Sequence, residues 1–246
     1  MRRIYILISF FVFFTFINTK VFSQFFLTFG PTAGVSVPIG DYSGETIDFY
    51  NGVKYGLKPG VNFGAMGVIR TQYINLKGGL TYSLFWNSGN AEYNRGSVEL
   101  KQNVLTFCIG PQYGQSIPNS KARIYVDALL LYSIFAGSSK FVDAPYVTDG
   151  KYDLNTTGRI GTQFGLGTEV KLETFRLDFN ISFGILNLTG KEFTNYQTES
   201  RENAYINLND NEDPFYSPTN ALHPIKSSRT ISLIKFNISA LYDINF

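Results

Sequence analysis

Apolar and polar residues alternate along most of the chain with a period of two, the pattern of β-strands whose two faces meet different surroundings. The last stretch shows it most clearly, because every second residue from 234 to the end is apolar or aromatic: Ile234, Phe236, Ile238, Ala240, Tyr242, Ile244 and Phe246. Helix is disfavoured because these stretches are rich in β-branched and aromatic residues and contain internal glycines. The pattern predicts strands at about 25–38, 59–70, 73–86, 102–113, 123–135, 160–172, 175–185 and 234–246.

The connections between these strands alternate between short and long. Three are short turns, at Thr71-Gln72, around Pro118-Asn119-Ser120 and at Glu173-Thr174. The other four are long and polar, at about 39–58, 87–101, 136–158 and 188–228. Short turns at one end and long loops at the other are typical of outer-membrane barrels, in which the turns are periplasmic. We therefore predict an all-β chain that forms one eight-stranded antiparallel up-and-down transmembrane β-barrel, with both termini in the periplasm.

The N-terminal segment is predicted to be a signal peptide that is removed. Arg2 and Arg3 form a basic start, and 4–17 is an almost unbroken apolar run that is short for a membrane span. Small or apolar residues at 21–23 place the cleavage site before Gln24, and no Cys stands there to mark a lipoprotein. The expected organisation is therefore a signal peptide at 1–23 followed by a barrel domain at 24–246.

Removing the signal peptide changes the charge of the protein. The whole chain has 21 basic and 19 acidic residues, but three basic ones precede the cleavage site, which leaves 18 against 19 and a net charge of −1. Nucleic-acid binding is therefore not indicated. The single Cys excludes an internal disulfide and a Cys-cluster metal site, and the single His disfavours a His-rich one. No metal and no cofactor are expected.

Alternation alone does not decide which face of the barrel lies inside, since a soluble lipocalin-like carrier would show the same period with the faces reversed. The polar face carries four positive and four negative residues: Lys77, Asp127, Glu169, Lys171, Arg176, Asp178, Lys235 and Asp243. Balanced charge suits an enclosed polar core, because each buried ion needs a partner. Many glycines share this face, which suits a narrow, strongly curved interior. We therefore predict a charge network in the lumen and an apolar face toward lipid.

The C-terminal strand resembles the signal that the bacterial barrel-assembly machinery reads, with Tyr242, Ile244 and Phe246 at alternate positions. The mature chain as a whole is similar to the outer-membrane β-barrel domain family, in particular the PorT-like small eight-stranded barrels of Gram-negative bacteria. The segments that carry this resemblance are GPTAGV at 30–35, LKPGVNFG at 57–64 and GGLTYS at 78–83. The resemblance implies an outer-membrane location and the assembly machinery as a partner during biogenesis. It implies no single activity, because a fold does not fix function.

Candidate catalytic residues are few. His223 lies in the last long loop, before the predicted strand at 234–246, where no strand orients a nucleophile beside it. The carboxylates Asp127, Glu169 and Asp178 allow an acid–base pair, but basic residues on the same face favour a structural ion network. We therefore expect no enzymatic activity.

The long loop at 188–228 combines aromatic and acidic residues, among them Tyr205, Asp210, Glu212, Asp213, Phe215 and Tyr216. This composition is typical of a contact surface, although a loop that packs on itself is equally compatible. The acidic run at 210–213 offers oxygen ligands for Ca²⁺ without the spacing of an EF-hand. The mildly acidic loops suit a basic protein partner, or divalent cations that bridge to lipopolysaccharide phosphates.

An eight-stranded barrel has an interior that side chains just fill, so solute transport is not expected. The sequence favours a structural or binding protein of the outer membrane that contacts lipid, lipopolysaccharide and a protein partner through its loops. An accessory subunit of a secretion or surface-assembly machine is the alternative that the PorT-like resemblance suggests. A narrow pore or an enzyme is the remaining class, which single-channel conductance separates from the others.

Overall fold

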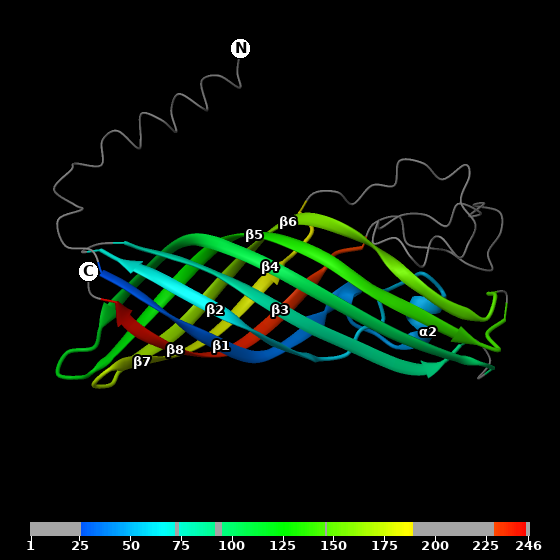
Figure 1. Ribbon diagram of the computed structural model, residues 1–246, viewed down its shortest axis with the longest axis horizontal. Coiled ribbons are helices and arrows are strands. Elements are labelled where there is room, and N and C mark those ends of the chain that lie inside the picture. Colours follow the sequence, from blue (N-terminus) through cyan, green and yellow to red (C-terminus); the bar gives the residue numbers. More distant parts are fainter. Residues whose placement is uncertain (1–25, 72–73, 92–94, 146, 189–228, 245–246) are drawn as a thin grey trace, which may run out of the picture.

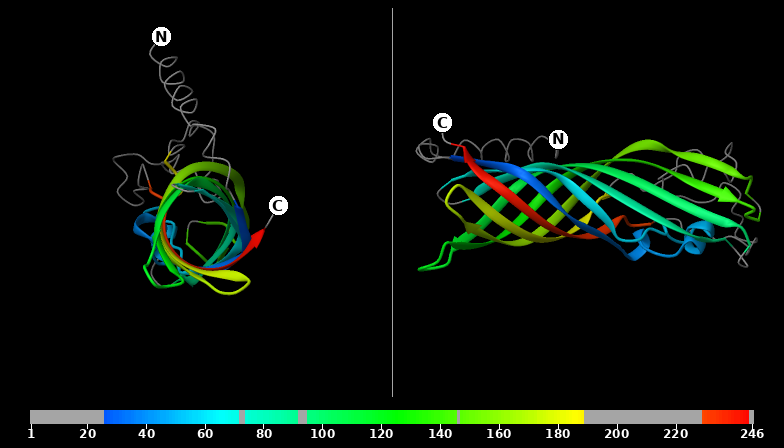
Figure 2. Two further views of the ribbon diagram at one scale, coloured as in Figure 1. Left: turned by 90° about the vertical axis from the view of Figure 1, so that its left-hand side faces the viewer. Right: turned by 60° about the horizontal axis from the view of Figure 1, so that its bottom comes forward.

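The computed structural model describes residues 26–71, 74–91, 95–145, 147–188 and 229–244. Eight strands follow one another around a closed barrel, and each is antiparallel to the next (Figures 1 and 2). The strands are β1 (Phe26–Ile39), β2 (Gly60–Arg70), β3 (Asn75–Asn90), β4 (Ser97–Ser116), β5 (Ala122–Val142), β6 (Gly150–Lys171), β7 (Phe175–Ile185) and β8 (Ser232–Ile244). The predicted eight-stranded antiparallel up-and-down barrel is confirmed.

The three short connections lie together at one end of the barrel, which we call the turn end; the opposite end is the loop end. The short connections join β2 to β3, β4 to β5 and β6 to β7, where the sequence places its turns. β1 begins and β8 ends at the turn end, where Leu27 of β1 pairs with Ile244 of β8 (Figure 1). The predicted signal peptide at 1–23 lies outside the described residues.

The two faces of the barrel wall differ in polarity. The outer face carries large apolar side chains that are 42% to 65% exposed, among them Phe107, Ile109, Leu130, Tyr132, Phe164, Leu166, Ile181, Phe183 and Ile238. The inner face carries buried polar and charged side chains, among them Thr28, Asn62, Lys77, Gln112, Asp127, Glu169, Asp178 and Lys235. The polar face of the alternation therefore lies inside, as predicted.

Two of the predicted long loops are mostly strand, which corrects the sequence analysis. β3 and β4 run through most of 87–101, and β5 and β6 occupy most of 136–158, so only 91–96 and 143–149 connect them. At the loop end these four strands extend beyond the last residue pairs that β3 forms with β2 and β6 forms with β7 (Figure 1).

The polarity of the wall reverses in this extension. On β4, Glu99 and Lys101 point outward while Val98 and Leu100 are buried inside, so the outward apolar pattern ends although the strand continues.

The connection between β1 and β2 is folded and covers the inner face of this extension. It contains the 3₁₀ turn η2 (Gly40–Tyr42) and the short helix α2 (Thr46–Tyr50), whose start is fixed by the Asp48 carboxylate accepting a hydrogen bond from Glu45 N at 3.0 Å. Buried side chains of this segment pack on buried side chains of β3, β4 and β5: Tyr42, Tyr50, Tyr55 and Leu57 against Phe85, Leu100 and Phe141. We call residues 40–57 the cap.

No helix in the described part of the chain is long and apolar enough to cross a membrane.

Glycine is required where neighbouring strands approach most closely. A Cβ added at Gly64 would lie 1.9 Å from the carbonyl oxygen of Leu80, whereas one at Gly184 would lie 3.6 Å from its nearest neighbour, the Thr162 oxygen. Gly64→Ala is therefore expected to destabilise the barrel by about 1–3 kcal/mol, because the backbone itself must move. Gly184→Ala is the matched control and should be near neutral. Chemical unfolding of the two variants measures the difference, and equal stabilities would contradict this close approach.

Candidate functional site: a charged lumen beneath an apolar cap

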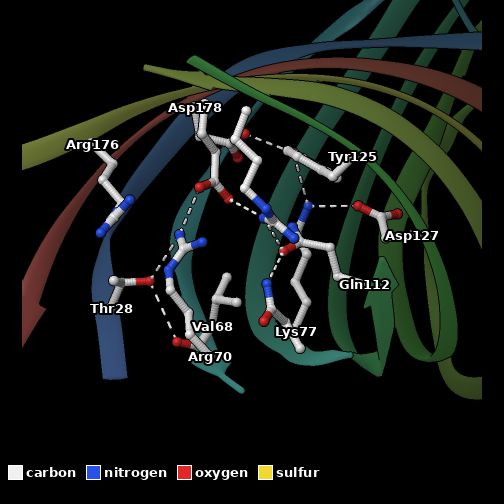
Figure 3. Close-up of polar contacts among 12 residues, drawn as sticks. Thr28, Val68, Arg70, Lys77, Gln112, Tyr125, Asp127, Arg176 and Asp178 are labelled. Atoms are coloured by element: carbon white, nitrogen blue, oxygen red, sulfur yellow. Dashed lines mark hydrogen bonds and ion pairs between the residues drawn. The ribbon is translucent and has the colours of Figure 1, made fainter. Parts of the chain in front are cut away.

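The middle of the lumen holds a buried ion pair within a hydrogen-bonded cluster. Lys77 Nζ on β3 lies 2.7 Å from Asp127 Oδ2 on β5, and the two side chains are 3% and 0% exposed. Asn180 on β7 donates to the same Asp127 oxygen at 3.3 Å. The Tyr125 hydroxyl donates to Asp178 Oδ1 at 2.7 Å, and Lys77 also contacts this hydroxyl at 3.3 Å (Figure 3). Residues from three strands thus cross-link the interior.

A second cluster lies nearer the turn end. Glu169 on β6 forms an ion pair with Arg70, in which Oε2 lies 2.8 Å from Arg70 Nη2, and its Oε1 accepts a hydrogen bond from Arg123 Nη1 at 3.3 Å, so one carboxylate serves two guanidinium groups from β2 and β5. Arg176 and Asp243 form a bidentate pair, with distances of 2.9 and 3.3 Å, between β7 and β8. These five strands contribute charged side chains to a cluster in which Glu169 and Asp243 are the carboxylates.

The structure places the eight predicted lumen residues unequally. Lys77, Asp127, Glu169 and Asp178 are buried in the two clusters. The Arg176 and Asp243 side chains are 13% and 28% exposed, so their pair borders solvent. These six residues are brought together by the fold.

Lys171 and Lys235 depart from the expectation of a single ion network. Lys171 is exposed at the last position of β6, outside both clusters, because the strand has already reached the turn end there. Lys235 is buried, and its Nζ donates to Thr81 Oγ1 at 3.3 Å. Among the described residues no carboxylate lies within ion-pair distance of Lys235.

Sequence reasoning missed three residues of these clusters, Arg70, Arg123 and Tyr125. The signal was present, because strand residues an even number of positions apart share a face. Arg123 and Tyr125 share the inner face with Asp127, and Arg70 shares it with Gly64. Asp127 and many of the glycines were assigned to the polar face, so extending the alternation to the strand ends identifies all three.

Little open space remains in the middle of the lumen. A cavity of about 20 Å³ is lined by polar side chains such as Lys77, Thr81, Asp178 and Lys235. This volume is enough for about one water molecule, which such polar walls would hold. The interior is therefore filled largely by the side chains of the described residues.

The cap closes the lumen at the loop end with an apolar layer. The Tyr42 ring packs edge-on against Phe85 and Tyr55, with centroid distances of 5.5 and 5.7 Å. Its hydroxyl donates to Gln102 Oε1 at 2.5 Å. Burial raises the pKa of the Tyr42 phenol well above its ordinary value, so the hydroxyl remains a donor at neutral pH. The Tyr50 hydroxyl donates to the carbonyl oxygen of Pro145, which joins the cap to the connection between β5 and β6.

The cap is also tied to the residues that immediately precede β8. Thr230 N donates to Asp41 Oδ2 at 3.1 Å, and the Arg229 guanidinium lies 4.4 Å from the centroid of the Tyr55 ring. Asn187, which follows β7, accepts from Ile231 N at 2.7 Å. Contacts to β3, β4, β5 and β8 therefore hold the cap in place.

Tyr42→Phe is expected to loosen the cap. The substitution leaves Gln102 Oε1 buried without its donor, which should destabilise the region by about 1–3 kcal/mol. Hydrogen–deuterium exchange of residues 40–57 measures the effect and should be faster in the variant. Tyr152→Phe is the matched control, because the Tyr152 hydroxyl makes only an exposed bond to the Thr148 oxygen. Unchanged exchange in Tyr42→Phe would contradict the role of this hydrogen bond.

Several predicted residues lie outside the described part of the chain. They are the loop residues Tyr205, Asp210, Glu212, Asp213, Phe215 and Tyr216, together with His223 and the C-terminal Phe246. Tyr242 and Ile244 are described, and both lie on the outer face of β8 with exposures of 51% and 36%. The Tyr242 ring packs against Phe175 with a centroid distance of 5.8 Å. Their reading as an assembly signal stays a prediction.

The fold and the two polar clusters define an eight-stranded up-and-down β-barrel with a charged lumen. No protein-family model matches the chain, and no curated protein matches it. Among solved structures, it is similar to Neisserial surface protein A, with 11% identity, a TM-score of 0.43, and coverage of 90% of this chain and 97% of that one. It is also similar to Ail, the attachment invasion locus protein of Yersinia pestis, with 9% identity, a TM-score of 0.39, and coverage of 89% and 97%. The Ail structure is a complex with the heparin analogue sucrose octasulfate.

Proposed function

We propose that the chain is an integral outer-membrane β-barrel with no open pore, whose loop end serves as a structural or binding surface. The observation that carries this proposal is the polarity of the wall. Exposed apolar side chains cover the outside of the barrel, while ions and hydrogen-bonding groups fill the inside. In water the exposed apolar outer face would be unfavourable, whereas a lipid exterior accounts for it.

The reversal of polarity in the extension supports a membrane boundary near the loop end. Trp86, whose side chain is 50% exposed, lies on the outer face where the apolar pattern ends. Its cross-strand partner is Lys101, and the next outward pair is Ser88 with Glu99. Tryptophan is enriched at membrane–water interfaces, and charged residues follow on the aqueous side. The extension and the cap would then project from the outer surface of the membrane, with the turn end in the periplasm.

The filled interior supports the absence of a pore and disfavours the lipocalin-like carrier. A carrier needs an apolar cavity, whereas the middle of the lumen holds charged pairs around a cavity of about 20 Å³. The cap adds a second, apolar obstruction at the loop end. An ion that crosses the lumen would have to displace the charged side chains in the middle and the apolar layer of the cap.

The cap and extension together give the loop end a rigid support for binding. Their apolar core is fully buried at Tyr42, Phe135 and Phe141, and Tyr50 and Asp41 tie the cap to neighbouring segments. Binding loops are commonly held by a rigid scaffold of this kind. The proposed partners are lipopolysaccharide and a protein at the outer surface, with the barrel-assembly machinery acting during biogenesis.

Electrophoretic mobility of membrane fractions with and without boiling tests the proposal. A folded transmembrane barrel that resists SDS should migrate differently until it is heated, and it should be found in the outer-membrane fraction. A protein in the soluble periplasmic fraction, with the same mobility before and after heating, would overturn the proposal. Single-channel recordings in planar bilayers test the absence of a pore separately, because steady conductance would contradict the filled lumen.

A further inference from the structure

The turn end of the lumen carries one more positive charge than its own carboxylates balance. Three arginines gather there, Arg70, Arg123 and Arg176, and they share two carboxylates, Glu169 and Asp243. The middle of the lumen is balanced separately, with two lysines, Lys77 and Lys235, and two aspartates, Asp127 and Asp178. Among the described residues at the rim, Lys121 and Lys171 outnumber Glu173, so these do not supply the missing negative charge.

Two buried hydrogen-bond donors in this region have no acceptor among the described residues. They are Arg70 Nε and Gln112 Nε2, in residues that are 5% and 1% exposed. The Gln112 carbonyl oxygen accepts from Asn75 at 2.9 Å and from Arg123 at 3.0 Å, which fixes the orientation of the amide. The amide NH₂ group therefore points away from both donors. Buried donors without acceptors are unfavourable, so an acceptor that enters from outside would be stabilised here.

The cluster is accessible from the turn end. The Arg123 and Arg176 side chains are 16% and 13% exposed. The Phe26 ring, 37% exposed, lies between Arg70 and Arg176, whose guanidinium carbons are 5.9 and 5.5 Å from its centroid. Figure 3 shows the Arg70 and Arg176 side chains reaching into the lumen near Thr28 from β2 and β7. A small group can therefore approach the arginines without passing the ion pair at Lys77.

We propose that the turn end of the lumen is a binding site for a phosphate group. Guanidinium groups present forked donors that match phosphate oxygens, and three of them approach this region from different strands. One phosphate monoanion would balance the excess charge and supply acceptors for Arg70 Nε and Gln112 Nε2. The group could come from free phosphate or from a lipid headgroup at the turn-end rim. If the barrel has the orientation proposed above, the site opens to the periplasm.

The test measures binding to the full chain, folded in phospholipid-free detergent. Inorganic phosphate is titrated by calorimetry, and thermal unfolding is compared in phosphate and chloride at matched ionic strength. A second arm replaces phosphate with phosphatidylglycerol in mixed micelles, which distinguishes the lipid source from the free ion. Phosphate should bind and raise the unfolding temperature in at least one arm. If neither arm gives binding above the chloride control, the proposal is wrong.

Arg123→Gln is the test variant, because Glu169 keeps Arg70 as a partner when Arg123 is lost. Losing one charge-assisted donor should weaken phosphate binding about tenfold or more. Lys171→Gln removes the same charge from the exposed rim and should leave affinity within about twofold. Arg176→Gln is a second test variant whose partner Asp243 remains partly in water, so it should fold. Equal weakening by Lys171→Gln would show a long-range charge effect and overturn the site. Because the measurements use the detergent-folded barrel, they are independent of its location in the cell.

Discussion

Leu166→Arg is expected to destabilise the folded barrel in a bilayer by about 2–4 kcal/mol. The Leu166 side chain is 65% exposed on the outer face of β6, and its cross-strand neighbours Val126 and Ile181 also point outward. Such an exposed leucine has few protein contacts to lose, so in water the substitution would be close to neutral. In a bilayer, the guanidinium must be placed in hydrocarbon. The size of the effect therefore reports the surroundings of the outer face directly.

Reversible unfolding by denaturant in lipid vesicles measures this difference. Ser88→Arg is the matched control, because Ser88 points outward on β3 beyond Trp86, where we place the aqueous side. The control should change stability by less than about 0.5 kcal/mol. If Leu166→Arg were as mild as the control, the outer face would not be in lipid and the proposed location would be wrong.

Lys77→Met is expected to be the most damaging substitution in the lumen, at about 3–5 kcal/mol. It leaves the Asp127 carboxylate, which is fully buried, with only neutral donors such as Asn180. Adding Asp127→Asn removes the uncompensated charge and should restore most of the lost stability. Denaturant unfolding of the two single variants and the double variant forms a thermodynamic cycle. Additive losses would contradict a direct interaction between the two side chains.

Arg176→Ala provides an internal comparison for this prediction. Its ion pair with Asp243 borders solvent, with side chains 13% and 28% exposed. Water partly screens this pair, whereas the Lys77–Asp127 pair is fully buried, so the loss should be clearly smaller than that of Lys77→Met. A larger loss for Arg176→Ala would mean that the turn-end cluster, rather than the middle of the lumen, controls stability.

The alternation of the sequence was sufficient to predict the barrel, its faces and its short turns. Within the apolar part of the wall, each residue lies either on the exposed apolar outer face or on the buried polar inner face, so the contrast between neighbouring residues is strong. The last strand illustrates this, with Phe236 and Ile238 outside and Lys235 and Ser239 buried inside. This information is local, because the identity of each residue reflects its own face.

The extension was not predicted because its surroundings differ from those of the rest of the wall. Beyond Trp86, outward residues such as Lys101 are polar, and inward residues such as Leu100 pack on the cap. A polar stretch after an apolar strand resembles a loop unless the reversed alternation is recognised. The reversal depends on residues 40–57, which are distant in sequence from β4, so no local pattern reveals it.

The partners in the ion network were equally inaccessible to sequence reasoning. Face assignment placed Glu169 inside, but its contact with Arg70 depends on the register of strands that lie far apart in the chain. Lys235 shows the same limit, because its face was correct while the hydroxyl to which it donates a hydrogen bond belongs to the neutral Thr81. Alternation gives the face of a residue, and the closed barrel determines which residues meet across the lumen.

The pairing of β7 with β8 has a consequence for how this protein can vary over evolution. Ile185 and Ser232 are neighbours in the sheet although a long connection separates them in the chain. The entropy of closing such a connection rises only slowly with length, by about 0.6 kcal/mol for each doubling. Insertions and deletions between these strands should therefore leave the barrel folded. Descendants of this chain can alter that connection extensively while the strands and the lumen stay unchanged.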